Sequence, residues 1–193
     1  MSCDITAGHI ESCKDSVSGL KAIYIINYDK VNSDNVDYSL VAGYEDQILT
    51  WTPTDTSVAL NLYKFELKST TNSFTTAIES SRDAGTTFFS QTLVAAIKRQ
   101  DAVTTKQVKI LSYGRPRIII RTMTDQFFLM GLDQGAISSG AALGDFNGYS
   151  LTFLAQEEMP ANFINCTTEA QLKVVFNTVN DGSGIDAEIV TGV

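Results

Sequence analysis

A chain of 193 residues is long enough for one domain and short for two. Hydrophobic residues make up 44% and charged residues 19%, so the chain can build a buried core and is not disordered throughout. Lys and Arg number 14 against 22 Asp and Glu, a formal net charge of −8 that argues against gripping nucleic acid through its phosphates. No apolar run approaches the ~20 residues of a membrane-spanning helix, so we expect no membrane association.

Cysteine and histidine are scarce. Cys3, Cys13 and Cys166 are odd in number and scattered, unlike the dense, paired cysteines of a secreted disulfide scaffold. The first residues also lack the basic-then-apolar order of a signal peptide, so we expect assembly in a reducing cytoplasm. Three alternatives stay open: a zinc site of Cys3, His9, Cys13 and Cys166, a Cys3–Cys13 disulfide, and free thiols. The spacing lacks a C-x2-C pair, which favours free thiols and predicts no metal and no cofactor.

Three segments are expected along the chain. Residues 1–19 are polar and without periodicity, which predicts an N-terminal arm. A β domain is expected over 20–179, and the Gly- and Asp-containing end predicts a flexible tail over 180–193. The β-branched and aromatic run at 20–28 predicts a strand buried on both faces. Residues 32–37 are rich in turn formers and predict a polar break.

Long strands with period-two alternation are predicted for the middle of the chain. Apolar and charged residues alternate over 58–68, and residues 73–82 alternate again. Turn formers at 69–72 would join these two strands into a hairpin, and another long strand is expected over 86–98. A weak strand pair is expected before them, at 38–42 and 47–51.

One helix is predicted, over residues 101–114. Asp101 can cap it, apolar residues follow at helical spacing, and Gly114 ends it.

Taken together, the predicted elements form a mainly β single domain with one short helix. The elements expected after the helix are strands at 115–123 and 126–131 joined by a two-residue turn at Thr124–Asp125, a thin strand or loop at 135–143, a strand at 149–157, one helical turn at 167–172 and a last strand at 173–179.

Motifs for catalysis are missing from the sequence. It contains no G-x-x-x-x-G-K-[ST] phosphate loop and no G-x-S-x-G nucleophile elbow, and His9 is the only histidine a Ser-His-Asp triad could use. We therefore expect no catalytic residue and no enzyme. Arg115, Arg117 and Arg121 share one face of their predicted strand, without the interleaved aromatic residues of a nucleic-acid surface. We expect them to pair with carboxylates within or between subunits, which makes them candidates for an inter-subunit contact.

The order of elements from about residue 20 to residue 165 resembles the major tail-tube protein of long-tailed bacteriophages. The likeness is one of element order and turn placement, without an invariant signature. The segments that carry it are, in chain order, the predicted long hairpin of 58–68 with 73–82, Gly85-Thr-Thr-Phe-Phe-Ser-Gln-Thr-Leu93, the helix ending at Tyr113-Gly114-Arg115, Ile118-Ile-Ile-Arg-Thr-Met123, Phe127-Phe-Leu-Met-Gly131, Ser139-Gly-Ala-Ala-Leu-Gly-Asp-Phe-Asn-Gly-Tyr149 and Leu151-Thr-Phe-Leu-Ala-Gln-Glu-Glu-Met-Pro-Ala161.

This resemblance implies a fold and an assembly. The fold would be a β-sandwich or half-barrel with one short flanking helix, and six copies would close into a ring whose inner sheets join into one β-barrel. Rings would stack through a long hairpin or loop and through terminal arms, for which residues 32–46 and 69–72 are candidates. The protein would lie in the virion tail beside other tail proteins, after assembly in the bacterial host, and viral DNA would pass through the lumen without specific binding.

An acidic lumen would suit such a conduit, because negative charge repels the phosphates of passing DNA. The strands 58–68, 73–82 and 115–131 are expected to line the barrel. The lumen-facing candidates on them are Glu66, Glu79 and Asp125. The alternative is that these carboxylates are solvated charges on the outside.

Two other kinds of protein fit the sequence. A phage head–tail connector or a capsid decoration protein would form one ring or a trimer instead of a polymer. A ligand- or glycan-binding β-sandwich would display exposed aromatic residues, whereas Trp51 is the only tryptophan and most Tyr and Phe residues alternate into predicted cores.

Overall fold

The structure is a computed structural model that describes residues 18–81, 85–98, 101–143, 147–179 and 181–191. It is mainly β, with one sheet of eight strands and one of four strands, neither of them closed into a barrel within the described ranges. The mainly β class is confirmed. The expectation of one helix is wrong, because the described chain forms two α-helices. Cys3, His9 and Cys13 lie outside the described residues, as does nearly all of the expected arm at 1–19, whereas Cys166 is a buried free thiol.

The larger sheet forms the centre of the molecule. Its middle strands, β1 (Leu20–Ile26) and β7 (Arg117–Thr122), carry near-continuous apolar runs, and a strand with two apolar faces needs cover on both sides. In order across the sheet, the strands are β12 (Glu188–Thr191), β4 (Asn61–Glu66), β1, β7, β8 (Phe127–Met130), β11 (Asn162–Ile164), β3 (Ile48–Pro53) and β2 (Val31–Tyr38). A short 3-10 turn, η1 (Tyr28–Lys30), joins β1 to β2.

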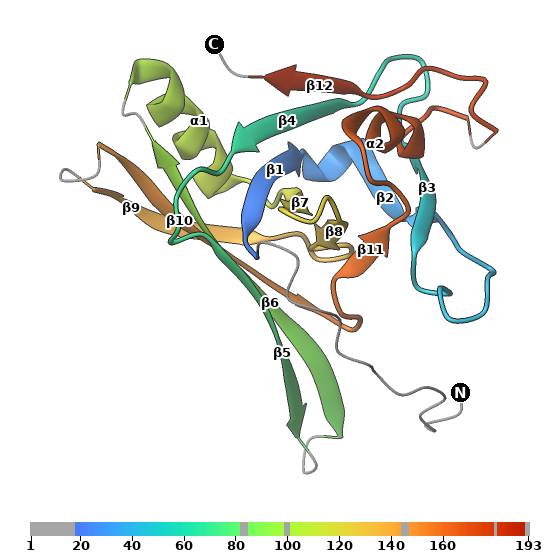
Figure 1. Cartoon of the computed structure of the whole chain (residues 1–193), viewed down its shortest axis with the longest axis horizontal. Coiled ribbons are helices and arrows are strands. Elements are labelled where there is room, and N and C mark those ends of the chain that lie inside the picture. The colour runs from blue at the N-terminus through green and yellow to red at the C-terminus, as the bar shows by residue number, and fades with distance from the viewer. Residues whose placement is uncertain (1–17, 82–84, 99–100, 144–146, 180, 192–193) are drawn as a thin grey trace.

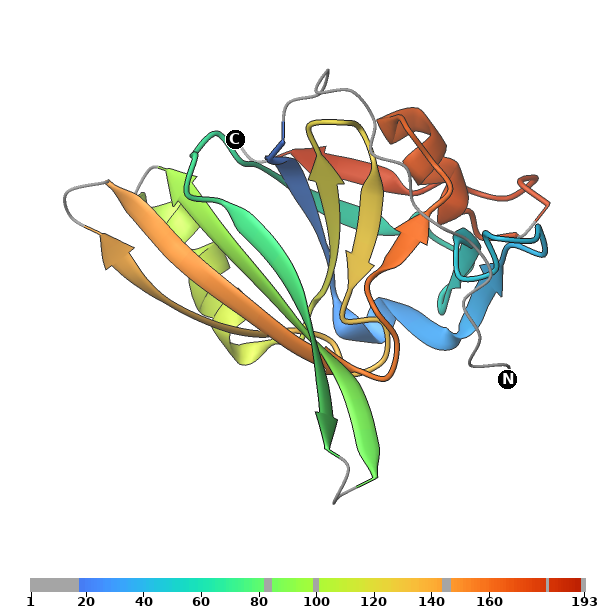
Figure 2. The ribbon, with the colours of Figure 1, turned by 60° about the horizontal axis from the view of Figure 1, so that its bottom comes forward.

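The smaller sheet is antiparallel throughout. Its order is β5 (Ser73–Ser81), β6 (Thr86–Lys98), β10 (Gly148–Glu157) and β9 (Ile137–Leu143). The far ends of β5 and β6 project from the body of the protein as an arm, which is plain at the bottom of Figures 1 and 2. Most β5 side chains in this arm are exposed, because the larger sheet does not reach it.

Two hydrophobic clusters cover the two faces of the larger sheet. The cluster between the sheets includes Ile23, Ile118, Leu93 and Phe153, which are all fully buried. The cluster on the opposite face is closed by α2 (Glu169–Val175), whose Leu172 and Val175 are buried. The larger sheet is therefore covered on both faces, whereas the smaller sheet is covered on one.

Helix α1 (Ala102–Tyr113) follows β6 and packs beside β9. Its boundaries confirm the prediction: the Asp101 side chain accepts a hydrogen bond from the Thr104 N–H, and the Gly114 N–H bonds back to the last turn. None of the residues of α1 is fully buried, so this helix adds little to the core.

The predicted hairpin of 58–68 with 73–82 is wrong. Strands β4 and β5 belong to different sheets, and the chain crosses from one sheet to the other after Glu66. Strand β4 is covered on both faces: Leu62 belongs to one cluster, and Tyr63 and Phe65 pack against the other. Strand β5 pairs with β6 instead, after a turn at Gly85, whose φ of +64° favours glycine.

Three further elements differ from the sequence predictions. Residues 32–37, predicted as a break, lie in the edge strand β2, whose register with β3 shifts twice and so hides the alternation. The last strand predicted at 173–179 is the end of α2 instead, because Thr168 and Gln171 form a capping box that starts a helix. The tail over 180–193, expected to be flexible, contributes β12, which pairs with β4 in parallel.

The turn between β7 and β8 is also longer than expected. Hydrogen bonds from the Thr122 N–H to the Gln126 carbonyl and from the Asp125 N–H to the Thr122 carbonyl enclose a three-residue loop. Asp125 ends this loop with a φ of +58°, the left-handed conformation that such loops require and that Asp tolerates. Among the described helices, none is both long enough and apolar enough to cross a lipid bilayer.

Candidate assembly interface

The smaller sheet has one face without cover, which we call the open face. Side chains alternate along each strand, and the register fixes which residues share this face. Most of them are small or carry a hydroxyl group. The open face consists of Ser73, Thr75, Ala77, Glu79, Thr86, Phe88, Ser90, Thr92, Val94, Ala96, Lys98, Ile137, Ser139, Ala141, Ser150, Thr152, Leu154 and Gln156.

The open face is close to neutral. Glu79 and Lys98 are its only charged side chains among the described residues. The net charge of −8 therefore resides elsewhere on the chain. A hydroxyl-rich surface without a basic cluster offers phosphate groups few charge-assisted contacts.

The three lumen-facing candidates are not brought together. Glu79 lies on the open face of β5, whereas Glu66 lies on β4 and Asp125 lies in the β7–β8 turn, both in the larger sheet. The Glu66 carboxylate accepts a hydrogen bond from the Lys68 ammonium at 2.9 Å, and this bond holds the pKa of the Glu66 carboxyl below the ordinary value. Two of the three strands expected to line a barrel, 58–68 and 115–131, are thus in the covered sheet.

Asp125 closes a small ion-pair group at the end of the larger sheet. Lys21 donates to Asp125 at 2.9 Å and Arg121 at 2.6 Å, and these two cations lower the pKa of the Asp125 carboxyl. Arg121 also donates to Glu169 at 2.9 Å, as does Lys64. Arg121 therefore pairs with carboxylates of its own subunit, which is one of the two arrangements expected for it.

Arg117 is a core residue. Its side chain is buried, with the residue 2% exposed, and its guanidinium donates to the carbonyls of Leu132, Tyr28 and Val31 at 2.6–2.7 Å. The guanidinium lies over the Tyr28 ring as well. In this fold a partner subunit has no access to Arg117. Arg115 is exposed and donates to the Gln134 carbonyl at 2.7 Å, so it stays a candidate for a contact between subunits.

The two edges of the smaller sheet are long and regular. β5 has nine residues and β9 has seven, and their registers with β6 and β10 run without a shift. Neither strand contains proline or lysine, the residues that commonly protect exposed edges. The larger sheet ends differently, in the four-residue β12 and in the bulged, acidic β2. The smaller sheet is therefore the one whose edge strands are long, regular and without proline or lysine.

An apolar pocket lies between α1 and the edge strand β9, and we call it the α1 pocket. Its volume is about 150 Å³. Val108 and Leu111 from α1 and Leu151 from β10 supply apolar walls, and the Ser138 hydroxyl donates to the Leu111 carbonyl at its margin. The rest of the lining is Ser112, Ser138, Ser139, Gly140, Ala141 and Tyr149.

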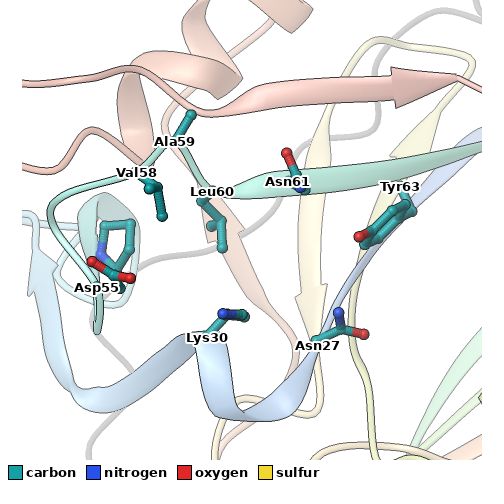
Figure 3. Close-up of a pocket in the computed structure, with 9 residues that line it drawn as sticks. Asn27, Lys30, Asp55, Val58, Ala59, Leu60, Asn61 and Tyr63 are labelled. Carbon is teal, nitrogen blue, oxygen red and sulfur yellow. The ribbon is translucent and has the colours of Figure 1, made fainter.

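A second hollow of about 100 Å³ lies between η1, the loop before β4 and β4 itself (Figure 3). Lys30 and Asp55 face it with opposite charges, beside Asn27, Asn61 and Tyr63. Asp55 is already engaged: it accepts hydrogen bonds from the Ser57 hydroxyl and N–H at 2.6 and 2.9 Å, which lower the pKa of its carboxyl.

Comparisons with protein-family models, with curated proteins and with solved structures found no match. Within the described ranges, no group of three or more His, Cys, Asp or Glu side chains is placed to hold a metal ion. The candidate interface is the smaller sheet, with its open face, its two edges and the α1 pocket. The sequence predicted its strands but not its edges.

Proposed function

We propose that this chain is a structural subunit that assembles with copies of itself through the edges of its smaller sheet, forming rings that stack into the tail tube of a long-tailed bacteriophage. The unprotected pair of edges carries this proposal, because long exposed strands pair with another chain unless something blocks them. Closing the sheet with further copies removes both edges at once.

Edge pairing between copies would continue the smaller sheet with the same alternation of strand direction. The four strands alternate in direction, so β9 runs opposite to β5. Copies related by rotation about a common axis keep the same orientation, which places β9 of one copy antiparallel to β5 of the next. The barrel so formed would be antiparallel throughout.

Few registers satisfy both the side-chain alternation and full pairing of β9. Directly opposed residues share a face, and the even-numbered residues of both β5 and β9 face the core. If all seven residues of β9 are paired, residues 137–143 lie opposite either 73–79 or 75–81 of the next copy. The two registers therefore differ by one two-residue step.

Both registers also give a plausible barrel geometry. Within one copy, β5 stands level with residues 86–94 of β6, whereas β9 stands level with residues 92–98. Pairing β9 of one copy with β5 of the next therefore shifts neighbouring copies along the strand direction. The shift is four residues when 137–143 lie opposite 73–79 and six residues when they lie opposite 75–81. With a rise of ~3.4 Å per residue and a strand spacing of ~4.8 Å, such an offset over four strands tilts the strands by about 35° or 45°. Closed barrels have tilts of this size.

The dimensions suit a conduit for DNA. Six copies, the number that the resemblance implies, would form a barrel of 24 strands, about 50 Å across at the backbone. The open face would line it, because the other face of the smaller sheet packs on the larger sheet. A lining of hydroxyl groups with one Glu and one Lys per copy would let phosphates pass without holding them.

Electron microscopy of the purified protein tests the proposal. The expected result is polymers with a central channel, with the smaller sheet around the channel and the larger sheet outside. Discrete rings that never stack would instead indicate a connector. A monomer at every concentration, with β5 and β9 exposed, would contradict the proposal.

A further inference from the structure

We infer that the side chain of Ile78 in one copy fills the α1 pocket of the next copy. This inference rests on the proposed edge pairing and adds a specific side-chain contact to it. The contact would connect the projecting arm of one subunit to helix α1 of the next, which packs beside β9.

Ile78 is an aliphatic side chain that its own subunit does not cover. It lies in the projecting part of β5, opposite Phe89, and is 69% exposed. Its side chain is on the core-facing side of the strand, although the larger sheet does not extend that far. The other side chains on this side of β5 are Phe74, which already packs against the core, and the small polar Thr76 and Ser80.

Both edge registers place Ile78 at the α1 pocket. Of the two registers that pair all of β9, one puts Ile78 opposite Ser138 and the other puts it opposite Gly140. Both of those residues line the α1 pocket. Since directly opposed residues in an antiparallel pair point to the same side of the sheet, the Ile78 side chain enters the space beneath α1 in either register.

The pocket matches an isoleucine in size and chemistry. A cavity of about 150 Å³ with aliphatic walls accepts a benzene-sized group, and the side chain of isoleucine is smaller. Gly140 contributes no side chain at the floor, and a Cβ there would come within 2.8 Å of the Leu151 side chain. A second copy of this chain is the occupant we propose, because the pocket adjoins an open strand edge and this chain presents an exposed isoleucine on the complementary edge.

Cross-linking tests the contact in the assembled protein. The variant carries Ile78→Cys and Ser112→Cys, with Cys3→Ser and Cys13→Ser to remove the native thiols of the N-terminal segment. In one subunit Ile78 lies on β5 at one edge of the smaller sheet, and Ser112 lies on α1 beside β9 at the other edge, so a short cross-link between them must join two copies. A short bismaleimide should give a ladder of covalent oligomers, and either single cysteine should not.

Assembly thresholds provide a second measurement. Ile78→Ser and Ser112→Phe, which fills the pocket from α1, should each raise the critical concentration for assembly at least about tenfold. The double variant should be no worse than the single ones, because both remove one contact. Ile185→Ser and Gln107→Phe are the controls, an exposed isoleucine and a residue of α1 outside the pocket lining, and should stay within about twofold.

The outcomes separate this inference from the proposed function. Assembled tubes that give no ladder, with unchanged thresholds in both variants, overturn the Ile78 contact and leave the edge pairing standing. A wild-type protein that never assembles overturns both. Unchanged circular dichroism and melting temperature in each variant would show that the monomer is still folded, so that a raised threshold reports the contact.

Discussion

The two sheets of this protein differ in what covers them. The larger sheet has a hydrophobic cluster on each face and ends in a short strand and a bulged strand. The smaller sheet has cover on one face, two long regular edges and an arm that projects from the body (Figure 2). In the proposed assembly the two sheets have different roles: the larger sheet would stabilise the subunit, and the smaller sheet would connect subunits.

The largest expected effect tests the stabilising role of the larger sheet. Trp51 is fully buried, donates from Nε1 to the Asn32 carbonyl at 2.8 Å and packs on Phe176. Trp51→Ala should lower the free energy of unfolding of the monomer by about 3–5 kcal/mol. Leu154→Ala on the open face, where the side chain is 42% exposed, should cost less than about 1 kcal/mol. Equal losses in urea unfolding would remove the distinction between the sheets.

The next effect concerns the polar group that attaches α2 to the larger sheet. Glu169 accepts hydrogen bonds from Lys64, Arg121 and Tyr24, each at 2.9 Å. Burial opposes its ionisation, yet the bonds from Lys64 and Tyr24 outweigh it and hold the pKa of Glu169 below the ordinary value. The carboxylate therefore adds stability above the unfolded-state pKa of about 4.3, and this stability is lost as the pH falls through the folded-state pKa.

Glu169→Gln should accordingly destabilise the monomer by about 1–2 kcal/mol at pH 7 and by much less near pH 3. Urea unfolding at the two pH values measures this, with the exposed Glu158→Gln as the control. A difference between wild type and Glu169→Gln that does not shrink in acid would contradict the assignment. Assembly at neutral pH should persist, since Glu169 is remote from the smaller sheet.

A smaller effect should appear in assembly alone. Ala77 and Ala141 are exposed on the open face, on β5 and β9, and lie opposite or diagonal to each other in the two registers. The pair Ala77→Glu with Ala141→Glu should raise the critical concentration roughly fivefold, because like charges would meet across each junction. The control pair, Ala77→Glu with Ala141→Lys, places opposite charges at the same junction and should restore assembly. A double-glutamate variant that assembles like wild type would argue against these edges.

The smallest effect concerns the lining. Glu79→Lys changes the open face, whereas the matched Glu66→Lys changes the larger sheet. Tubes of the first variant should retain duplex DNA that nuclease cannot reach, and added salt should release it. The second should retain no protected DNA. Protection by both variants, or by neither, would show that the open face does not line the channel.

The sequence predicted elements better than it predicted their partners. The span of β6 and the caps of α1 follow from alternation and from Asp101 and Gly114, which are local signals. The assignment of β4 and β5 to one hairpin failed, because both strands alternate and alternation alone does not say which sheet a strand joins. The strand β12 was missed because it is short and becomes a strand only by pairing with β4, whose partner residues lie 127 positions earlier in the chain.

The candidate site depended even more on tertiary structure. Glu66 and Glu79 carry the same charge in similar strands, and only the sheet order separates them. Arg117 has the sequence context of a surface stripe, yet three carbonyls and the Tyr28 ring hold it inside the fold. The α1 pocket has no sequence signature, since its walls come from α1, β9 and β10. Ile78 alternates with the core-facing residues of β5, and only the structure shows that its side chain lies beyond the core.

Hydrogen exchange of the backbone amides, compared between dilute monomer and assembled protein, tests the pairing of the edges most directly. The amides of β5 and β9 that point away from their own sheet should exchange freely in the monomer and at least about tenfold more slowly after assembly. The edge strands β2 and β12 provide the internal reference and should change little. Assembled material in which β5 and β9 exchange as fast as in the monomer would contradict the account.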